Sequence, residues 1–420
     1  MKHLALLLPG LDRIGGAERQ VLLLAKGLRR RGWRISIVVL SGSGAAAASD
    51  VAESGIPLHS LGMRKGLADP RGWLRFYRWL RCQRPDIVHA HLPHAAWLAR
   101  WSRLFAPIPV LVDTLHSSWT GGAGKQLAYR LSRQFPDCVT AVSHAAASAH
   151  LQARTIVAGK LAVVPNAVDT AQWHPDPSTR AALRRDLGLG DAFVFLAAGR
   201  LEPVKDYPTL LQAMTGLRQS AGLLIAGDGS QREELTALAA RLGQSDRVRF
   251  LGFQRDLRAW MQAADAFVLS SRWEGLPLAL LEAAACALPA IATDVPGTRE
   301  AVVEGQTGWL VPFGDPVALA YAMNRMSTTS LQKRQAMGAS ARCFVVARFG
   351  LEMILDRWEA LYGELHSGGR PAIYRAPRTG RADASLRLPA ACAIAPELRT
   401  LFPPGPDAPD EIPPEPDRRR

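Results

Sequence analysis

Short apolar runs alternate with longer amphipathic stretches along most of the chain, and this alternation restricts the folds that are open to it. His3–Leu8 and Arg34–Leu40 have the composition of buried strands, and Ala17–Arg30 between them is a predicted helix. Strands that alternate with helices are typical of a parallel sheet covered by helices on both faces. Four more strands are predicted in this half, at Asp86–His91, Val110–Thr114, Cys138–Val142 and Leu161–Pro165.

The alternation stops at Val168–Pro177, where prolines and polar residues interrupt it, and then begins again. A chain of 420 residues is long enough for two or three domains. We therefore predict two doubly wound α/β domains of similar size, over residues 1–170 and 171–349. The predicted strands of the second domain are Phe193–Ala197, Gly222–Ala226, Val248–Phe250, Ala266–Leu269 and Ala290–Thr293.

The last part of the chain has a different composition. From about Gly368 the apolar periodicity is lost, and proline, arginine and acidic residues accumulate. Such a composition buries too little apolar surface to fold, so residues 367–420 are predicted to be a disordered tail. The apolar segment Leu386–Leu398 leaves open an alternative, in which the tail is an arm that binds a membrane or a partner.

The chain is strongly basic, with 51 Lys and Arg against 37 Asp and Glu and a formal net charge of +14. A basic surface favours anionic partners such as nucleic acid, nucleotide phosphates or an anionic membrane leaflet. The arginine clusters do not belong to a recognisable nucleic-acid-binding motif, so nucleic acid is not an expected partner. No apolar run approaches the roughly 20 residues that span a bilayer, so any membrane contact is expected to be peripheral. The five cysteines are widely spaced and form no CxxC pair, which fits a reducing compartment, and we expect a cytoplasmic protein.

One predicted helix combines basic and aromatic side chains, and it raises the hypothesis of such a peripheral contact. Trp73, Phe76 and Trp79 alternate there with arginines. A basic aromatic helix can lie on an anionic membrane, whereas ordinary core packing of the aromatic rings is the competing interpretation. The arginines of this stretch are Arg71, Arg75 and Arg78.

The most specific pattern follows the fourth predicted strand of the second domain. It contains two glutamates separated by seven residues, Glu274 and Glu282. Pro277 suits the first turn of a helix, which places Glu274 before that helix and Glu282 on its second turn. Free N–H groups at the helix start, preceded by Gly275 and Leu276, would hold a diphosphate. Paired carboxylates also occur in glycosidases, but a helix start suited to phosphate argues against that chemistry.

A second group of residues lies after the first predicted strand of the second domain. Arg200 and Lys205 extend from the loop that begins at Gly199. Doubly wound sheets bind ligands at the carboxyl ends of their strands, and two cations there would neutralise the charge on a departing nucleotide diphosphate. The competing interpretation is an exposed basic loop in an already basic protein.

Glycines and histidines add weaker signals. Gly227 after another strand, and Gly15 and Gly16 before the first helix, could bring backbone N–H groups close to a ligand, although simple tight turns would have the same composition. His116 follows the predicted strand Val110–Thr114 and faces the expected crevice. A metal site at His89, His91 and His94 is not predicted, because neither a cysteine nor a carboxylate nearby completes a set of ligands.

With these residues in view, the chain resembles a large family of retaining glycosyltransferases of GT-B fold, glycosyltransferase family 4, over about residues 1–365. Glu274 and Glu282 match the family's pair of glutamates, and Gly199-Arg200-Leu201 with Lys205 matches its diphosphate-binding pair. Ala167 is a departure, because the family usually has glycine there. Further matches are Gly15-Gly16-Ala17-Glu18, Val142-Ser143, Pro165-Asn166-Ala167-Val168-Asp169 and the stretch from Glu304 to Pro312.

The resemblance implies an α/β GT-B fold in which two Rossmann-like domains face each other across a cleft. Residues 1–170 would bind the acceptor and 171–349 the nucleotide sugar, while 350–366 would form a helix that crosses back to the first domain. Retention of configuration would need neither a protein nucleophile nor a metal or other cofactor. Arg200 and Lys205 would stabilise the leaving diphosphate, Glu274 and His116 would contact the sugar, and Glu282 would bind the ribose. Gly15, Gly16, Gly199, Gly227, Gly275 and Leu276 would complete the donor site.

The expected activity is therefore transfer of a sugar from a nucleotide diphosphate onto a glycan or polyprenyl-linked acceptor, in polysaccharide or lipopolysaccharide assembly. The contact with anionic membrane would then be on the cytoplasmic face of the plasma membrane. Two alternatives stay open. A sugar-nucleotide epimerase or hydrolase would bind the same donor without an acceptor, and a non-enzymatic module binding membrane or nucleic acid would explain the charge but leave both glutamates without a role.

Overall fold

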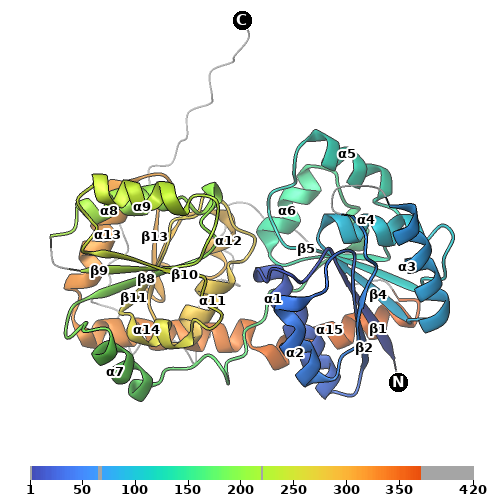
Figure 1. The fold of residues 1–420 in the computed structure, drawn as a ribbon, viewed down its shortest axis with the longest axis horizontal. Helices are drawn as coiled ribbons and strands as arrows, with labels where there is room; N and C mark the ends of the chain where they lie inside the picture. Colours follow the sequence, from blue (N-terminus) through green and yellow to red (C-terminus); the bar gives the residue numbers. More distant parts are fainter. Residues whose placement is uncertain (1, 65–68, 219–220, 370–420) are drawn as a thin grey trace, which may run out of the picture.

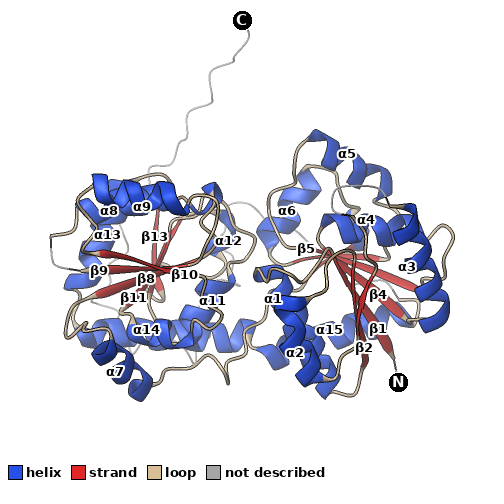
Figure 2. Cartoon of the chain, viewed as in Figure 1, coloured by secondary structure: helices blue, strands red, loops and turns tan. Residues whose placement is uncertain are grey.

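The computed structural model describes residues 2–64, 69–218 and 221–369, so the predicted tail lies outside the described residues from residue 370 on. Two α/β domains stand side by side, each built on one parallel sheet with helices on both faces (Figures 1 and 2). This arrangement confirms the predicted fold class. It follows from strands that are apolar on both faces, such as His3–Leu8, in which every residue is buried.

The first sheet has seven strands in the order β3-β2-β1-β4-β5-β6-β7. Its strands are β1 (His3–Leu8), β2 (Arg34–Val39), β3 (Leu58–Ser60), β4 (Ile87–His91), β5 (Val110–Leu115), β6 (Cys138–Ala141) and β7 (Leu161–Val163). The helices between them are α1 (Gly16–Arg30), α2 (Ala48–Ser54), α3 (Pro70–Gln83), α4 (Pro93–Ser102), α5 (Ala123–Ser132) and α6 (His144–Gln152), with short 3-10 turns at Ala45–Ala47 and Ala158–Lys160.

The second sheet has six strands in the order β10-β9-β8-β11-β12-β13. Its strands are β8 (Val194–Ala198), β9 (Gly222–Ala226), β10 (Val248–Gly252), β11 (Ala266–Leu269), β12 (Ala290–Thr293) and β13 (Gly308–Val311). The helices are α7 (Pro177–Asp186), α8 (Tyr207–Thr215), α9 (Arg232–Arg241), α10 (Arg258–Ala263), α11 (Leu278–Ala285), α12 (Pro296–Arg299), α13 (Pro316–Thr328) and α14 (Leu331–Phe349), with a 3-10 turn η3 at Pro203–Lys205.

All predicted strands are present, and each of their ends lies within two residues of the predicted one. Two edge strands were not predicted, β3 and β13. β3 is only three residues long and mostly half-exposed, so it has too few residues to show a period. β13 lies in the stretch after Glu304, where the glycine and threonine before it suggest a turn.

The chain passes between the domains twice, and the two crossings are hydrogen-bonded to each other. Val168 N–H donates to the Phe349 carbonyl at 2.8 Å, and Leu351 N–H donates to the Val168 carbonyl at 3.0 Å. α15 (Leu351–His366) then packs into the core of the first domain through Leu355, Trp358 and other apolar residues. The helix α15 is therefore part of the first domain's core.

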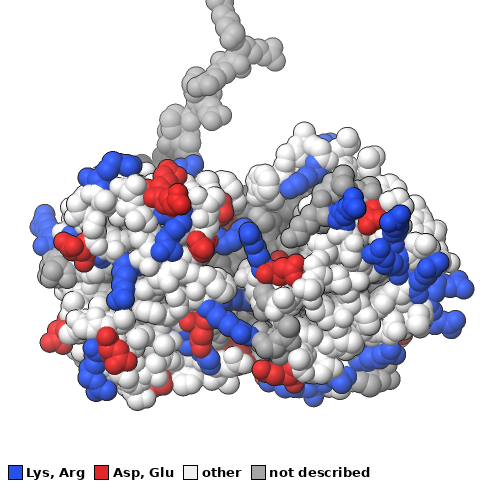
Figure 3. Space-filling model, viewed as in Figure 1, with Lys and Arg blue, Asp and Glu red and all other residues white. Residues whose placement is uncertain are grey.

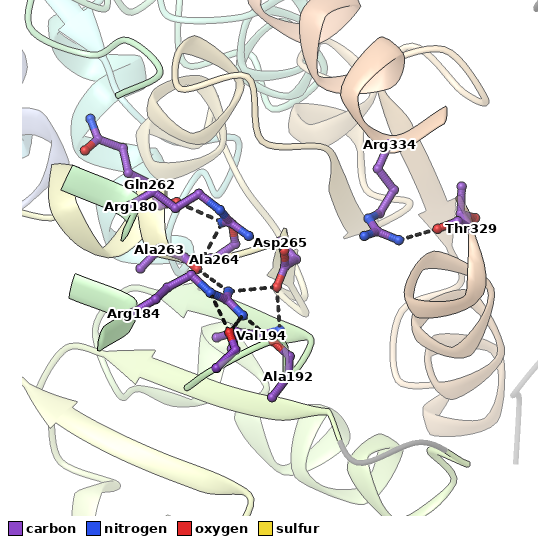
Figure 4. Close-up of polar contacts among 11 residues, drawn as sticks. Arg180, Arg184, Ala192, Val194, Gln262, Ala263, Ala264, Asp265, Thr329 and Arg334 are labelled. Atoms are coloured by element: carbon purple, nitrogen blue, oxygen red, sulfur yellow. Dashed lines mark hydrogen bonds and ion pairs between the residues drawn. The ribbon is translucent and has the colours of Figure 1, made fainter. Parts of the chain in front are cut away.

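The end of the second sheet opposite the carboxyl ends of its strands is fixed by an ion cluster (Figure 4). The guanidinium groups of Arg180 and Arg184 on α7 both point to Asp265, at 2.6 and 3.1 Å from its carboxylate oxygens. Asp265 also accepts a hydrogen bond from the N–H of Val194, the first residue of β8, at 2.9 Å. These contacts hold α7 at the amino ends of the strands. The cluster therefore lies away from the carboxyl ends, where a ligand of such a sheet binds.

The basic aromatic helix is α3, and its aromatic rings face the protein interior. Phe76 is fully buried, and Trp73 and Trp79 are half-buried against the same apolar cluster. Arg71, Arg75 and Arg78 are exposed on the outer side of the helix. Core packing is therefore the correct interpretation of the aromatic residues, and α3 contributes charge but few apolar side chains to the surface.

Candidate active site

The strand order places two crevices opposite each other. In each sheet the order reverses once, between β1 and β4 in the first and between β8 and β11 in the second. Ligands of doubly wound sheets bind beyond the carboxyl ends of the strands at such a reversal. Gly199 follows β8 and Ser270 follows β11, so both predicted donor motifs begin at the reversal of the second sheet.

Lys205 and Glu274 meet at this reversal. The Lys205 Nζ lies 2.5 Å from Glu274 Oε1, and Ser271 Oγ donates to the same oxygen at 2.7 Å. Both charged side chains are largely buried, with 19% and 13% of their surface exposed. Asp206 ends the turn η3 in the left-handed conformation, with φ of 49°, and connects this turn to α8. The predicted cation and the predicted carboxylate thus form one unit.

Two of the predicted glycines allow the backbones of β8 and β9 to approach each other. Gly227 has a φ of +146°, and a Cβ there would lie 1.9 Å from the Gly199 carbonyl oxygen. A Cβ at Gly199 would lie 3.2 Å from Lys205 Cε. Arg200, between these glycines and Lys205, is exposed and has neither a hydrogen bond nor an ion pair to its side chain within the described part of the chain. It is therefore available to an anion.

The helix α11 begins beside the Lys205–Glu274 pair. Pro277 is its N-cap rather than part of its first turn, so the helix starts one residue later than predicted, and no side chain of the described residues caps it. Its first N–H groups and its positive dipole end are therefore suited to hold an anion. Glu282 lies on the second turn and is buried, which raises its pKa to about 7. Arg19 from α1 lies 3.7 Å from Glu282 and lowers that pKa, but by less than burial raises it.

Of the predicted residues in the first domain, His116 lies at the boundary with the second. It follows β5, and its ring Nε2 is 3.0 Å from Nδ1 of His91, the last residue of β4. Burial lowers the pKa of His116 to about 4. His89 is bonded to Tyr362 and Thr114 deeper in the sheet, and His94 is exposed on α4, so the three histidines do not converge. Among the described residues no group of His, Cys, Asp and Glu is arranged to hold a metal ion.

The predicted glycine loop Gly15-Gly16 lies at the start of α1. The Gly15 N–H donates to the Glu18 carboxylate at 3.0 Å, so it is already bound within its own helix turn. Gly16 faces the second domain, because a Cβ there would lie 3.3 Å from Leu278 Cδ1 of α11. The loop therefore brings α1 close to the start of α11, and donor binding by Gly15 and Gly16 stays a prediction.

The domains also touch through residues that the motifs did not single out. Ser118 Oγ donates to the Glu274 carbonyl at 2.8 Å, and Asn166 Nδ2 donates to the Leu276 carbonyl at 2.8 Å. The Glu300 carboxylate accepts hydrogen bonds from the N–H groups of His144 and Ala145, at the start of α6. A carboxylate at a helix N-terminus is electrostatically favourable. The bonds of Ser118 and Asn166 hold the first domain against the loop that carries Glu274, and those of Glu300 hold it against the end of α12.

At Gly275 the backbones of the two domains approach each other closely, and this supports a prediction. A Cβ there would lie 2.4 Å from the His116 carbonyl oxygen and 3.2 Å from Ser117 Cα, which are backbone atoms of the other domain. Gly275→Ala should push the domains apart and lower kcat/KM about 100-fold, the order expected for a 1 Å misplacement. Steady-state kinetics of the variant measure this, with Gly159→Ala as control, because a Cβ at Gly159 meets no atom within 4 Å. Equal kinetics for both variants would contradict the prediction.

Sequence reasoning missed Arg19, Ser118 and Glu300. A sequence signal was available only for Asn166, which lies in the stretch from Pro165 to Asp169. The partners of all four lie more than 100 residues away in the sequence, so local spacing carries no trace of them.

Comparisons with known proteins identify the family of the chain. Residues 14–172 match the family model described as Glycosyltransferase Family 4, and residues 179–344 match the model described as Glycosyl transferases group 1. A D-inositol 3-phosphate glycosyltransferase of Streptomyces bingchenggensis is 32% identical over 313 residues, or 68% of each chain. The UDP-Gal:alpha-D-GlcNAc-diphosphoundecaprenol alpha-1,3-galactosyltransferase of Escherichia coli is 26% identical over 70% of this chain and 80% of that protein.

Among solved structures, Anabaena HepE in complex with UDP-glucose is similar, with a TM-score of 0.77 and 25% identity over 86% of this chain and 99% of that one. Sucrose-phosphate synthase from Thermosynechococcus elongatus shares the fold, with a TM-score of 0.76 at 22% identity, over 88% of this chain and all of that one. Two domain matches in the order of the chain and these relatives lead to one conclusion. The chain belongs to glycosyltransferase family 4, and it is a glycosyltransferase that uses nucleotide-sugar donors.

Proposed function

We propose that the chain is a retaining hexosyltransferase that needs no metal and moves a sugar from a nucleotide diphosphate onto a lipid-linked glycan acceptor. The observation that carries this proposal is the Lys205–Glu274 pair beside the uncapped start of α11. A cation and free N–H groups would bind the diphosphate of the donor, and the carboxylate would accept hydrogen bonds from hydroxyl groups of the sugar.

The proposed reaction breaks the bond between the anomeric carbon and the diphosphate oxygen. The acceptor hydroxyl attacks the anomeric carbon from the face that the diphosphate leaves, and its proton passes to the departing phosphate oxygen. Arg200, Lys205 and the α11 N-terminus stabilise the negative charge that develops on the diphosphate. Glu274 orients the sugar, Glu282 binds the ribose, and His116 contacts the sugar from the first domain. Contacts across the boundary, such as that between Ser118 and Glu274, complete the site when the domains are closed.

The acceptor class is inferred from the relatives and from the surface. The E. coli relative is named for a diphosphoundecaprenol-linked acceptor, and a relative from Mycobacterium leprae, 28% identical, is a phosphatidyl-myo-inositol mannosyltransferase. Both of these acceptors carry a lipid. These two relatives therefore support a lipid-linked acceptor in the assembly of an envelope polysaccharide or lipopolysaccharide.

The direct test is a donor screen with UDP-, GDP- and ADP-sugars, followed by transfer to polyprenyl-diphosphate-linked glycans. We expect one donor to give a product whose new linkage keeps the donor's anomeric configuration by NMR, and EDTA to leave the rate unchanged. An inverted product or loss of activity in EDTA would contradict the mechanism. Epimerised or hydrolysed donor in the absence of acceptor would instead support the alternative enzyme class.

The outer surface of the first domain suits a membrane at which such acceptors are found. Large apolar side chains are exposed on α5 and beside it, including Trp119 at 57%, Leu127 at 56% and Leu131 at 67%. Lys125 and Arg130 of α5 lie among them, and Figure 3 shows further Lys and Arg side chains over the side of this domain where α3 lies. No helix in the described ranges combines the length and apolar content needed to cross a bilayer.

We therefore expect α5 to contact anionic lipid at the cytoplasmic face of the membrane. Trp119 is only three residues after His116, so this face adjoins the acceptor side of the cleft. Leu127→Glu with Leu131→Glu should reduce co-sedimentation with vesicles of 30% phosphatidylglycerol about ten-fold or more, because two apolar contacts become like-charge repulsion. The matched control is Val317→Glu with Tyr321→Glu, at exposed apolar positions of α13 in the second domain. Equal binding by both variants would contradict the assignment.

A further inference from the structure

The two histidines that meet at the acceptor side of the site form a pair whose protons can be assigned. His91 ends β4 and is buried, and its Nδ1 lies 3.0 Å from His116 Nε2. Leu92, directly after His91, has φ of 71° and ψ of 155°, a region that is essentially restricted to glycine. The backbone is therefore strained at Leu92, directly beyond the end of β4 and next to His91.

The ring of His91 is also held from behind by His89. The two ring centroids are 3.9 Å apart. Thr140 Oγ1 donates to the Asp113 carbonyl at 3.2 Å, so it accepts from Thr114 at their 2.6 Å contact. Thr114 must then accept from His89 Nε2, at 2.6 Å, which leaves His89 Nδ1 as the acceptor from the Tyr362 hydroxyl at 2.7 Å. Both ring nitrogens of His89 therefore have hydrogen-bond partners, and its fixed ring packs against the ring of His91.

Each of His91 and His116 is neutral, because burial lowers both pKa values below the usual range. A neutral imidazole has one N–H and one bare nitrogen, so a single proton lies between His91 Nδ1 and His116 Nε2. His91 Nε2 is buried and has no partner among the described residues. If the shared proton belonged to His116, His91 Nε2 would be a buried donor without an acceptor. If it belongs to His91, Nε2 is only an unused acceptor, which is less unfavourable in a protein interior.

We propose that His91 is a positioning residue that donates through Nδ1–H to His116 and so fixes the proton of His116 on Nδ1. His116 Nδ1 has no hydrogen-bond partner among the described residues and is not one of the buried unpaired atoms, so it is open to the cleft. His116 thus presents an N–H donor to the cleft, and a hydroxyl oxygen of the substrate would be its acceptor. This last step rests on the proposed function, whereas the tautomer does not.

The tautomers can be read by NMR on the full chain with histidines labelled with 15N and 13C, without any substrate. We expect His116 and His91 to carry their protons on Nδ1, and His89 on Nε2. A His116 with its proton on Nε2 would overturn the proposal. That result would arise if a water in the cavity of about 30 Å³ lined by His91 and His116 accepted from His91 Nε2–H.

Two variants separate positioning from mere packing. His91→Phe should keep the ring volume but release the His116 proton, so that the NMR signature shifts toward the Nε2–H form and kcat falls about ten-fold with little change in the KM for the donor. His91→Gln, which can still donate through its amide, should keep the Nδ1–H signature and most of the activity. An unchanged His116 tautomer in His91→Phe would refute the role of His91. An altered tautomer with unchanged kcat would support the role of His91 in fixing the proton of His116, but it would contradict the proposed contact of His116 with substrate.

Discussion

Lys205→Met is expected to lower kcat for sugar transfer by about 10²–10³-fold, the usual cost of removing one group that stabilises developing charge. The methionine keeps the length of the side chain that packs over Gly199, but it has no charge to offer the departing diphosphate. The donor KM should change much less, because Arg200 and the start of α11 still bind the diphosphate in the ground state. An interaction that strengthens as the bond breaks affects kcat rather than KM.

Lys333→Met is the matched control, because Lys333 is a half-buried lysine at the start of α14 in the same domain. Its kinetics should equal those of the unmodified protein. If Lys205→Met raised the donor KM and left kcat unchanged, Lys205 would bind the donor without stabilising the leaving group. An unchanged kcat/KM would remove Lys205 from the reaction altogether.

The fold could be predicted from the sequence because most strands are long and apolar enough to be recognised as apolar runs. β1 is buried along its entire length, and the glycine, proline or polar residues near each strand end mark where it stops. The same reasoning failed at β3, where three mostly half-exposed residues pair with β2 only because β2 is already in place. Edge strands of this kind are determined by tertiary pairing, which overrides local composition.

The donor half of the site could also be predicted from the sequence, because Arg200, Lys205 and Glu274 follow neighbouring strands, and the carboxyl ends of parallel strands lie at one edge of the sheet. What the sequence could not provide is the contact between domains. Glu300 caps α6 across the boundary, and nothing near either segment indicates the other. The role of His91 was missed for a similar reason: β4 and β5 had to be paired in register before His91 could be seen to meet His116.

Glu282 is the residue at which stability and function should conflict most clearly. Burial raises its pKa from 4.5 to about 7, so in this pH range the folded protein holds a proton that the unfolded chain releases. The free energy of unfolding must therefore fall as the pH rises from about 4.5 to about 7, by about 3 kcal/mol in total. Glu282→Gln removes this titration. The variant should be more stable than the unmodified protein by about that amount at pH 8 and nearly equal to it at pH 4.5.

Urea unfolding at both pH values measures this difference, and Glu233→Gln, at an exposed position of α9, should change the stability by less than about 1 kcal/mol at either pH. The prediction is contradicted if the difference in free energy of unfolding between Glu282→Gln and the unmodified protein is the same at pH 8 and at pH 4.5. Ionisation of Glu282 would then cost the folded state little free energy. The role proposed for Glu282, binding of the ribose, would use the negative charge that weakens the fold. The stabilised variant should therefore bind the nucleotide donor less tightly at pH 8, because an amide accepts a hydrogen bond from a ribose hydroxyl less strongly than a carboxylate does.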